Sequence, residues 1–291
     1  MAPRIAVIIP CYGEGVLVAE AVRSVQETEP VEVVVVDNAS PDDETRRVLS
    51  ELEADGVRVR RHGANLGPAH ARSTGLAATT ARYVLPLDGD DLAIAGVLGR
   101  MADALDADPG AAACVGDIVE FGDHELVRRI PTRLDPYRVA YTNEYPVTAL
   151  FRRAAIDATR AWEPMPGLDG YEDWRCWMAL AEHGSRIVHL GGPGYLRRLH
   201  GHRLNHEART RHRANYASMR AAHPELIRRL PELRRASDLS PVKRLLYPVV
   251  YGARAEVPFE RRLKPLFDRL GVWTRADPAA REGTRARPPG A

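Results

Sequence analysis

The sequence predicts an α/β fold in which a mostly parallel β-sheet is covered by helices on both faces. Short apolar runs alternate with segments of helical periodicity through the first ninety residues. The apolar runs are nearly uninterrupted, which is typical of parallel strands buried on both faces. Polar residues follow three of the four runs directly. Parallel sheets bind ligands beyond the carboxyl ends of their strands, so these polar residues are the first candidates for a site.

The elements of the first part of the chain follow from hydrophobic spacing. Strands are expected at 4–9, 31–36, 56–61 and 82–87, of which the one at 56–61 is weaker and more polar. Helices are expected at 16–28, from Ser40 onward and at 68–79. Ser40 suits the N-cap of the second helix, and Pro41 suits its first helical position.

The remainder of the chain is less regular. Helices are expected at 94–106, within 144–159 and at 171–183, with a strand at 111–121 and a short strand at 185–190. After Asn205 the pattern is helical, basic and interrupted by prolines. The last residues, 274–291, are rich in Arg, Ala, Pro and Gly, a composition typical of disorder.

Composition excludes several classes of protein. With 45% hydrophobic and 27% charged residues, the chain is neither mainly disordered nor fibrous. Cys11, Cys114 and Cys176 lie far apart and form no CxxC pair, which argues against a disulfide scaffold or a Cys-based zinc site. The apolar run at 5–9 is too short for a signal peptide, and no run approaches the ~20 residues that span a bilayer. We therefore expect a soluble cytoplasmic protein, with any membrane contact peripheral and at the inner face.

Charge is unevenly distributed, although the net charge is only +2. From Arg197 to the last residue there are 22 Lys and Arg against 9 Asp and Glu, whereas the preceding residues have 19 against 30. A basic C-terminal region favours an anionic partner, such as a membrane surface, a phosphorylated lipid or nucleic acid. The alternative is a solvated helical face, and the sequence leaves both interpretations open.

Two common nucleotide-binding motifs are absent. Gly13 and Gly15 follow the first strand, but Val18 occupies the place of the third glycine of a dinucleotide fingerprint. No P-loop is present either. Instead, Asp88-Gly89-Asp90-Asp91 follows the fourth strand and offers carboxylates to a divalent cation that also contacts phosphates. The alternative interpretation is a polar turn that caps the next helix.

The chain resembles the family 2 glycosyltransferases of the GT-A fold. The matching segments occur in the order of the family over residues 4–205: Ile8-Ile9-Pro10-Cys11-Tyr12, Val35-Val36-Asp37-Asn38-Ala39-Ser40, Asn65-Leu66-Gly67-Pro68 with Ala71-Arg72, Leu87-Asp88-Gly89-Asp90-Asp91, Glu172-Asp173-Trp174 and Arg198-Leu199-His200. The resemblance implies a mostly parallel, Rossmann-like central sheet flanked by helices. It also implies a domain at 1–205 with a nucleotide-binding half (1–92) and an acceptor half (93–205). A helical basic extension (206–273) and a disordered tail (274–291) lie outside it.

The resemblance also implies roles for individual residues. The nucleotide-sugar contacts would be Pro10, Tyr12, Glu14, Asp37, Asn65, Arg72, Asp88 and Asp90. Asp90, Asp88 and His200 would hold Mg²⁺ or Mn²⁺. Asp173 would be the general base, with Glu172 as its neighbour or as an acceptor ligand. Each residue type also has an ordinary structural explanation, as a turn residue, an exposed Arg, a structural His or an acid in the first turn of a helix. Ser73 stands where the family often has Asn, which is a mild departure.

The expected function is a metal-dependent inverting glycosyltransferase that uses a UDP-, GDP- or dTDP-sugar. The acceptor would be a glycan, a lipid-linked molecule or a small molecule, in cell-envelope or polysaccharide biosynthesis, and no nucleic acid is expected as a partner. A processive synthase is disfavoured, because the sequence has neither membrane spans nor a Gln-x-x-Arg-Trp segment. Two alternatives stay open: a non-catalytic nucleotide-sugar-binding protein and a sugar nucleotidyltransferase.

Overall fold

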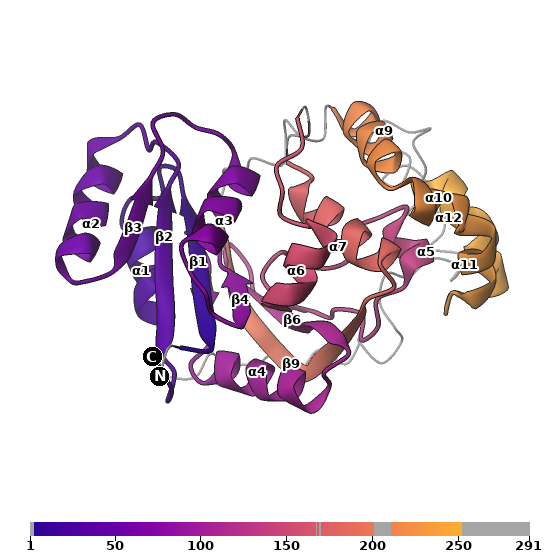
Figure 1. Cartoon of the computed structure of the whole chain (residues 1–291), viewed down its shortest axis with the longest axis horizontal. Helices are drawn as coiled ribbons and strands as arrows, with labels where there is room; N and C mark the ends of the chain where they lie inside the picture. The colour runs from indigo at the N-terminus through magenta and orange to yellow at the C-terminus, as the bar shows by residue number, and fades with distance from the viewer. Residues whose placement is uncertain (1–2, 167, 169, 201–210, 252–291) are drawn as a thin grey trace.

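The fold is built on one nine-stranded mixed sheet, and the computed structural model describes residues 3–166, 168, 170–200 and 211–251 (Figure 1). The strand order is β3-β2-β1-β4-β8-β6-β9-β5, with β7 paired to β6. The strands are β1 (Ile5–Cys11), β2 (Val31–Asp37), β3 (Arg58–Arg61), β4 (Tyr83–Pro86), β5 (Leu92–Ala93), β6 (Ala111–Gly122), β7 (Leu126–Arg128), β8 (Leu150–Arg152) and β9 (Arg186–Leu199). The predicted α/β fold class is confirmed.

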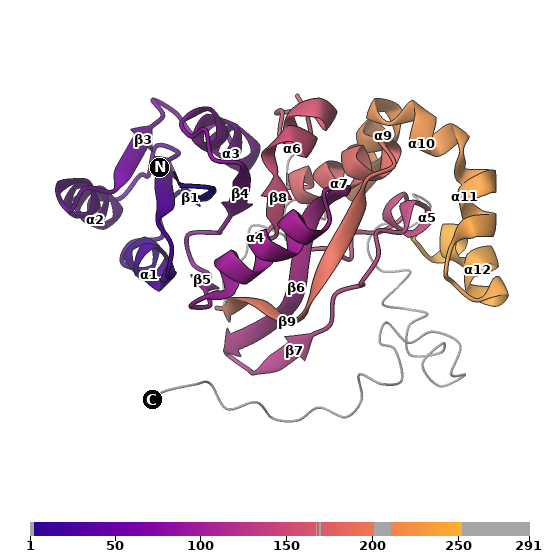
Figure 2. The ribbon, with the colours of Figure 1, turned by 60° about the horizontal axis from the view of Figure 1, so that its bottom comes forward.

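Helices cover both faces of the sheet (Figure 2). One face packs against α1, α2 and α4, and the other packs against α3, α6 and α7. The helices in the first part are α1 (Leu17–Ser24), α2 (Asp43–Ala54), α3 (Pro68–Ala77) and α4 (Val97–Ala107). Those farther on are α5 (Pro136–Val139), α6 (Arg153–Thr159), α7 (Glu172–Glu182), α9 (His212–Ala222), α10 (Pro224–Arg228), α11 (Leu230–Ala236) and α12 (Pro241–Tyr251).

The first four strands form the expected parallel half of the sheet. β1 lies between β2 and β4, and all three run in the same direction. The apolar side chains of β1 from Ile5 to Ile9 are fully buried, which explains why this strand shows no polar alternation. Because Cys11 pairs with Asp37, the loops after β1 and β2 emerge together at one edge.

The second half of the sheet is mixed. β8 is antiparallel to both β4 and β6, whereas β6 and β9 are parallel and interrupted by bulges. The expected short strand at 185–190 was wrong in length, since β9 continues to Leu199. The glycines and the proline within β9 are residues that are typical of a turn. In the structure they allow close approach, because a Cβ on Gly116 of β6 would lie 2.6 Å from the Gly194 backbone.

The start of α2 also differs from the expectation. Asp42 is its N-cap, and the Asp42 carboxylate accepts a hydrogen bond of 2.7 Å from Thr45 N. Ser40 was therefore the wrong cap. Its backbone N–H donates instead to Asp37 Oδ1 at 2.8 Å, and Ala39 before it has a φ of 63°. The preference of Asp37 for this local turn delays the helix by two residues.

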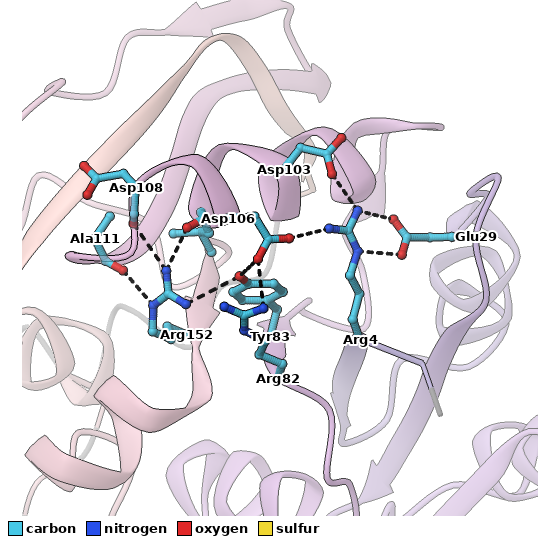
Figure 3. Close-up of polar contacts among 10 residues, drawn as sticks. Arg4, Glu29, Arg82, Tyr83, Asp103, Asp106, Asp108, Ala111 and Arg152 are labelled. Atoms are coloured by element: carbon cyan, nitrogen blue, oxygen red, sulfur yellow. Dashed lines mark hydrogen bonds and ion pairs between the residues drawn. The ribbon is translucent and has the colours of Figure 1, made fainter. Parts of the chain in front are cut away.

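A polar junction ties α4 to the edge where the parallel strands begin (Figure 3). Arg152 of β8 donates to Leu105 O, Asp108 O and Ala111 O, at 2.8, 3.3 and 3.1 Å. Tyr83 of β4 donates to Asp106 Oδ1 at 2.6 Å. Arg152 therefore binds Leu105 O and Asp108 O at the end of α4, where carbonyl groups lack partners within the helix, and Ala111 O at the start of β6.

The helices α9 to α12 form the end of the molecule opposite β2 and β3 in both views (Figures 1 and 2). Their buried residues, including Tyr216, Leu226 and Tyr247, join the same core cluster as α7. The helical basic extension is thus confirmed for its described part, while the expected tail at 274–291 lies outside the described residues. Within the described residues, none of the helices has both the length and the apolar character needed to cross a bilayer.

The strand β3 forms one outer edge of the sheet. Its only buried side chain is that of Val59, which is 7% exposed. Arg58, Arg60 and Arg61 are all exposed along the strand. Arg61 forms an ion pair of 2.9 Å with Glu53 of α2, and Arg58 pairs with Glu32 of β2.

Candidate active site

The loop after β2 is held by the side chain of Asn38. Asn38 Nδ2 donates to Asn65 Oδ1 at 2.6 Å, and Asn38 Oδ1 accepts from Leu66 N at 3.0 Å. His62 Nδ1 lies 2.9 Å from the same Asn38 oxygen. Asp37, which is 5% exposed, shares this turn. The arrangement brings the predicted contacts Asp37 and Asn65 to one edge, through two residues that were not predicted as site residues.

The loops after β1 and β4 lie against each other. A Cβ on Gly89 would lie 3.1 Å from Pro10 O and 3.2 Å from Glu14 Cγ, so a larger residue would crowd this contact. Glu14 also accepts a hydrogen bond from the backbone of Tyr12, whose side chain is 41% exposed. Burial raises the pKa of Glu14, and the nearby Asp90 raises it further. Two predicted nucleotide contacts, Pro10 and Glu14, therefore lie against the acidic loop, and Tyr12 is bonded to Glu14.

Arg72 joins the two halves of the site. Its Nη2 donates to Asp88 Oδ1 and its Nη1 donates to Glu172 Oε1, both at 3.0 Å. The Arg72 side chain is 6% exposed. Burial alone would lower the pKa of this guanidinium, but the two carboxylates outweigh burial and raise it. Arg72 is therefore a fixed cation between the acidic loop and the start of α7.

Asp90 faces His200, the last residue of the segment Arg198-Leu199-His200. Asp90 Oδ2 lies 2.7 Å from His200 Nε2, and both side chains are partly exposed. The neighbouring Asp91 is buried and accepts a hydrogen bond of 2.9 Å from Arg198 N. Burial, together with Asp88 and Asp90, raises the pKa of Asp91 well above its usual value. Asp91 therefore anchors the end of β9 to the acidic loop.

Asp90 and His200 together suit a divalent cation that takes only a few of its ligands from the protein. Among the residues that the structure describes, no three Asp, Glu, His or Cys side chains converge on one point as a complete metal site. Asp88, the third predicted ligand, is bound to Arg72. Mg²⁺ commonly takes one or two protein ligands and completes its shell with water and substrate phosphates. The donor set present fits a cation of that kind.

Asp173 is the most perturbed carboxylate of α7. Its Oδ1 accepts from Trp174 N at 2.6 Å, and its Oδ2 accepts from Asn143 Nδ2 at 2.9 Å. Burial raises the pKa of Asp173 to about 7, with a further contribution from the adjacent Glu172. A carboxylate with this pKa can take up a proton near neutral pH. Asn143 was not predicted, because nothing in the sequence marks a residue 30 positions away as its partner.

The two tryptophans of α7 belong to the core. Trp174 and Trp177 are 6% and 0% exposed, and each indole N–H donates to a backbone carbonyl, of Val139 at 2.6 Å and of Pro146 at 3.0 Å. Trp174 also stacks on Tyr216 of α9, with the ring centroids 5.5 Å apart. Both indoles are therefore packing residues, and their packing fixes the start of α7.

The mixed sheet, with an acidic loop after β4 facing the start of α7, defines a glycosyltransferase fold of the GT-A class. The chain belongs to glycosyl transferase family 2, since the model of that family matches residues 6–159. The family resemblance inferred from the sequence is confirmed.

Curated relatives match between a third and two fifths of the chain. The β-1,3-glucosyltransferase of Campylobacter jejuni named for GalNAc(5)-diNAcBac-PP-undecaprenol is 30% identical over 104 residues, which cover 34% of this chain and 33% of that protein. The succinoglycan biosynthesis protein ExoO of Rhizobium meliloti is 32% identical over 118 residues, covering 40% of this chain and 33% of ExoO. Each match therefore spans about a third of the relative.

Solved structures resemble nearly the whole chain. TarS 1–349 of S. aureus in complex with UDP-GlcNAc has a TM-score of 0.64 and 18% identity, with 94% of each chain covered. The mannosyltransferase PcManGT of Pyrobaculum calidifontis, in complex with GDP-Man and Mn²⁺, has a TM-score of 0.55 and 20% identity. That match covers 94% of this chain and 81% of PcManGT. At these identities the likeness establishes the fold.

Proposed function

We propose that the protein is a non-processive, inverting glycosyltransferase that moves a sugar from a nucleoside diphosphate to an acceptor hydroxyl with the help of Mg²⁺ or Mn²⁺. The observation that carries this proposal is the double contact of Arg72, with Asp88 on one side and Glu172 on the other. It connects the acidic loop that would face the donor to the residue beside the proposed base.

The proposed chemistry begins with Asp173 as general base. Its carboxylate takes the proton of the acceptor hydroxyl, and the acceptor oxygen attacks the anomeric carbon of the donor sugar. The bond from that carbon to the diphosphate oxygen breaks on the opposite side, so the configuration inverts. A base placed in this way typically contributes 10²–10⁴-fold to the rate. Asn143 and Trp174 N hold both carboxylate oxygens in position.

The donor would lie across the carboxyl ends of β1, β2 and β4. In this proposal the half at 1–92 binds the nucleotide through Pro10, Tyr12, Glu14, Asp37, Asn65, Arg72 and Asp88. Asp90 and His200 would hold the cation, which when bound offsets the negative charge on the departing diphosphate. Two solved structures of similar fold are complexes with UDP-GlcNAc and with GDP-Man. UDP- and GDP-sugars are therefore the first donors to test, with dTDP-sugars as the third class.

The acceptor would bind on the half at 93–205, where α7 carries Glu172 and Asp173. A lipid-linked acceptor is our first candidate class, since one relative is named for an undecaprenol diphosphate substrate. A glycan in cell-envelope or polysaccharide biosynthesis is the second, in keeping with the succinoglycan relative. We place the reaction in the cytoplasm, where the three free, buried thiols would stay reduced.

The test is transfer and binding with a panel of nucleotide-sugars, with and without Mn²⁺. We expect one donor class to raise the melting temperature more with Mn²⁺ than without it. Asp90→Ala should remove that increment, and Asp173→Asn should keep it while losing about 10²–10⁴-fold in turnover. Wild-type turnover in Asp173→Asn would show that the base is misassigned. Binding without transfer or hydrolysis would indicate a binding protein, and release of pyrophosphate would indicate a nucleotidyltransferase.

A further inference from the structure

The outward face of α12 is apolar. Val242, Leu245 and Val249 are 54%, 61% and 50% exposed, and their spacing of three and four places them on one side of the helix. The opposite side packs into the core through Tyr247 and Val250, which are 3% and 4% exposed. A surface helix ordinarily turns its charged side to water. We name Val242, Leu245 and Val249 the apolar stripe of α12.

The helical region that carries this stripe is basic. Between residues 211 and 251 the sequence has nine Lys and Arg against three Asp and Glu. Arg234 and Arg235 at the end of α11 are exposed, and within the described residues neither forms an ion pair with a carboxylate. Lys243 lies on α12 itself. An apolar stripe on a basic helical region is the pattern of a helix that lies in the plane of a membrane interface.

We propose that the apolar stripe of α12 and the basic residues of its helical region dock the protein on an anionic lipid surface. Charge complementarity selects this occupant. A second copy would bring two cationic faces together, and residues 252–291, with nine Lys and Arg against five Asp and Glu, carry the same sign of charge. Lipid headgroups of opposite sign complement the basic residues, while the acyl region receives the apolar side chains.

The position of α12 leaves the candidate active site free. The helix lies at the end of the molecule opposite β2 and β3, on the same side of the sheet's centre as α7 (Figures 1 and 2). Docking there would hold the half that carries Asp173 next to the membrane, and the edge formed by β3 away from it. The proposal goes beyond sugar transfer and holds whatever the donor and the acceptor are.

The experiment is vesicle flotation of the full chain. Phosphatidylcholine vesicles with and without phosphatidylglycerol are the probes, and binding is expected only with the anionic lipid. Leu245→Asp combined with Val249→Asp should weaken binding at least about tenfold. Arg234→Gln combined with Arg235→Gln should weaken it about tenfold or more at low salt, and less at high salt. Leu126→Asp on β7, a residue 53% exposed and far from α12 in sequence, is the matched control and should bind as the wild type does.

Three results would overturn the proposal. Equal binding to neutral and anionic vesicles, or none to either, would exclude an anionic lipid surface. A dimer in sedimentation equilibrium that Leu245→Asp dissociates would assign the stripe to a second copy. A loss of several degrees of melting temperature in Leu245→Asp without vesicles would show that the stripe is covered by the chain itself.

Discussion

Asp173 owes its proposed role to its surroundings more than to its residue type. Its carboxylate is placed beside Glu172 and away from bulk water, and both effects favour the protonated form. Two hydrogen bonds then fix its orientation, one from the backbone of Trp174 and one from Asn143. The same residue in an exposed first turn of a helix would be ionised at all physiological pH values and free to rotate.

The raised pKa of Asp173 gives a pH profile with a defined sign. A general base works in its deprotonated form, so activity is lost as pH falls through the folded-state pKa of about 7. We expect kcat/KM to fall about tenfold per pH unit below that value. Initial rates from pH 5 to 9 with saturating Mn²⁺ measure this. A profile that is flat down to about pH 5 would contradict the assignment.

Asn143 should act as a positioning residue. Asn143→Ala removes the donor to Asp173 Oδ2, which both frees the carboxylate and removes a bond that favours its charged form. We expect kcat to fall about ten- to a hundredfold with little change in donor KM, and the acid limb of the profile to move to higher pH. An unshifted limb with a lowered melting temperature would indicate a purely structural role.

At the scale of elements, the packing of one helix on the sheet depends on a residue that has no side chain. α3 approaches β1 at Gly75, where a Cβ would lie 2.2 Å from Ile8 Cγ2. This contact sets the distance of α3 from the sheet, and α3 carries Arg72. The position of the cation between the two halves of the site therefore depends on a residue without a side chain.

Gly75→Ala is expected to destabilise the protein by about 1–3 kcal/mol, because Ile8 is fully buried and has no room to move. For a chain of this size, that corresponds to several degrees of melting temperature. Gly63→Ala is the matched control, since a Cβ added at Gly63 would meet no other part of the protein within 4 Å. Equal melting temperatures for the two variants would contradict this account of the packing.

The sequence predicted most elements of the parallel half because buried strands and amphipathic helices leave periodic signals. It missed the N-cap at Asp42, since two good caps lie within three residues and the local turn of Asp37 decides between them. It missed the length of β9, since Gly and Pro that usually mark a turn here permit a bulge. The contact of Arg72 with Glu172 spans 100 residues, and no local pattern encodes such a contact.

At the scale of the whole molecule, the residues of the junction in Figure 3 contribute unequally to stability. Arg4 pairs with Glu29, Asp103 and Asp106, but its side chain is 32% exposed and exposed pairs contribute little. Arg152 instead binds backbone carbonyl groups at the end of α4 and at the start of β6. The attachment of α4 to the central sheet therefore depends mainly on Arg152.

Arg152→Met should lower the free energy of unfolding by about 2–3 kcal/mol, since a charged donor to several carbonyl groups is lost. Arg4→Met should cost less than about 1 kcal/mol, and high salt should reduce even that difference. Urea denaturation of both variants at two salt concentrations measures these values. A larger effect of Arg4→Met would reverse the order that the geometry gives.

The outer strand β3 has a consequence for crowded solutions. Any foreign strand that added to this border would have to remove water from Arg60 and disturb the ion pairs of Arg58 and Arg61. Growth of the sheet from one molecule into the next is thereby opposed.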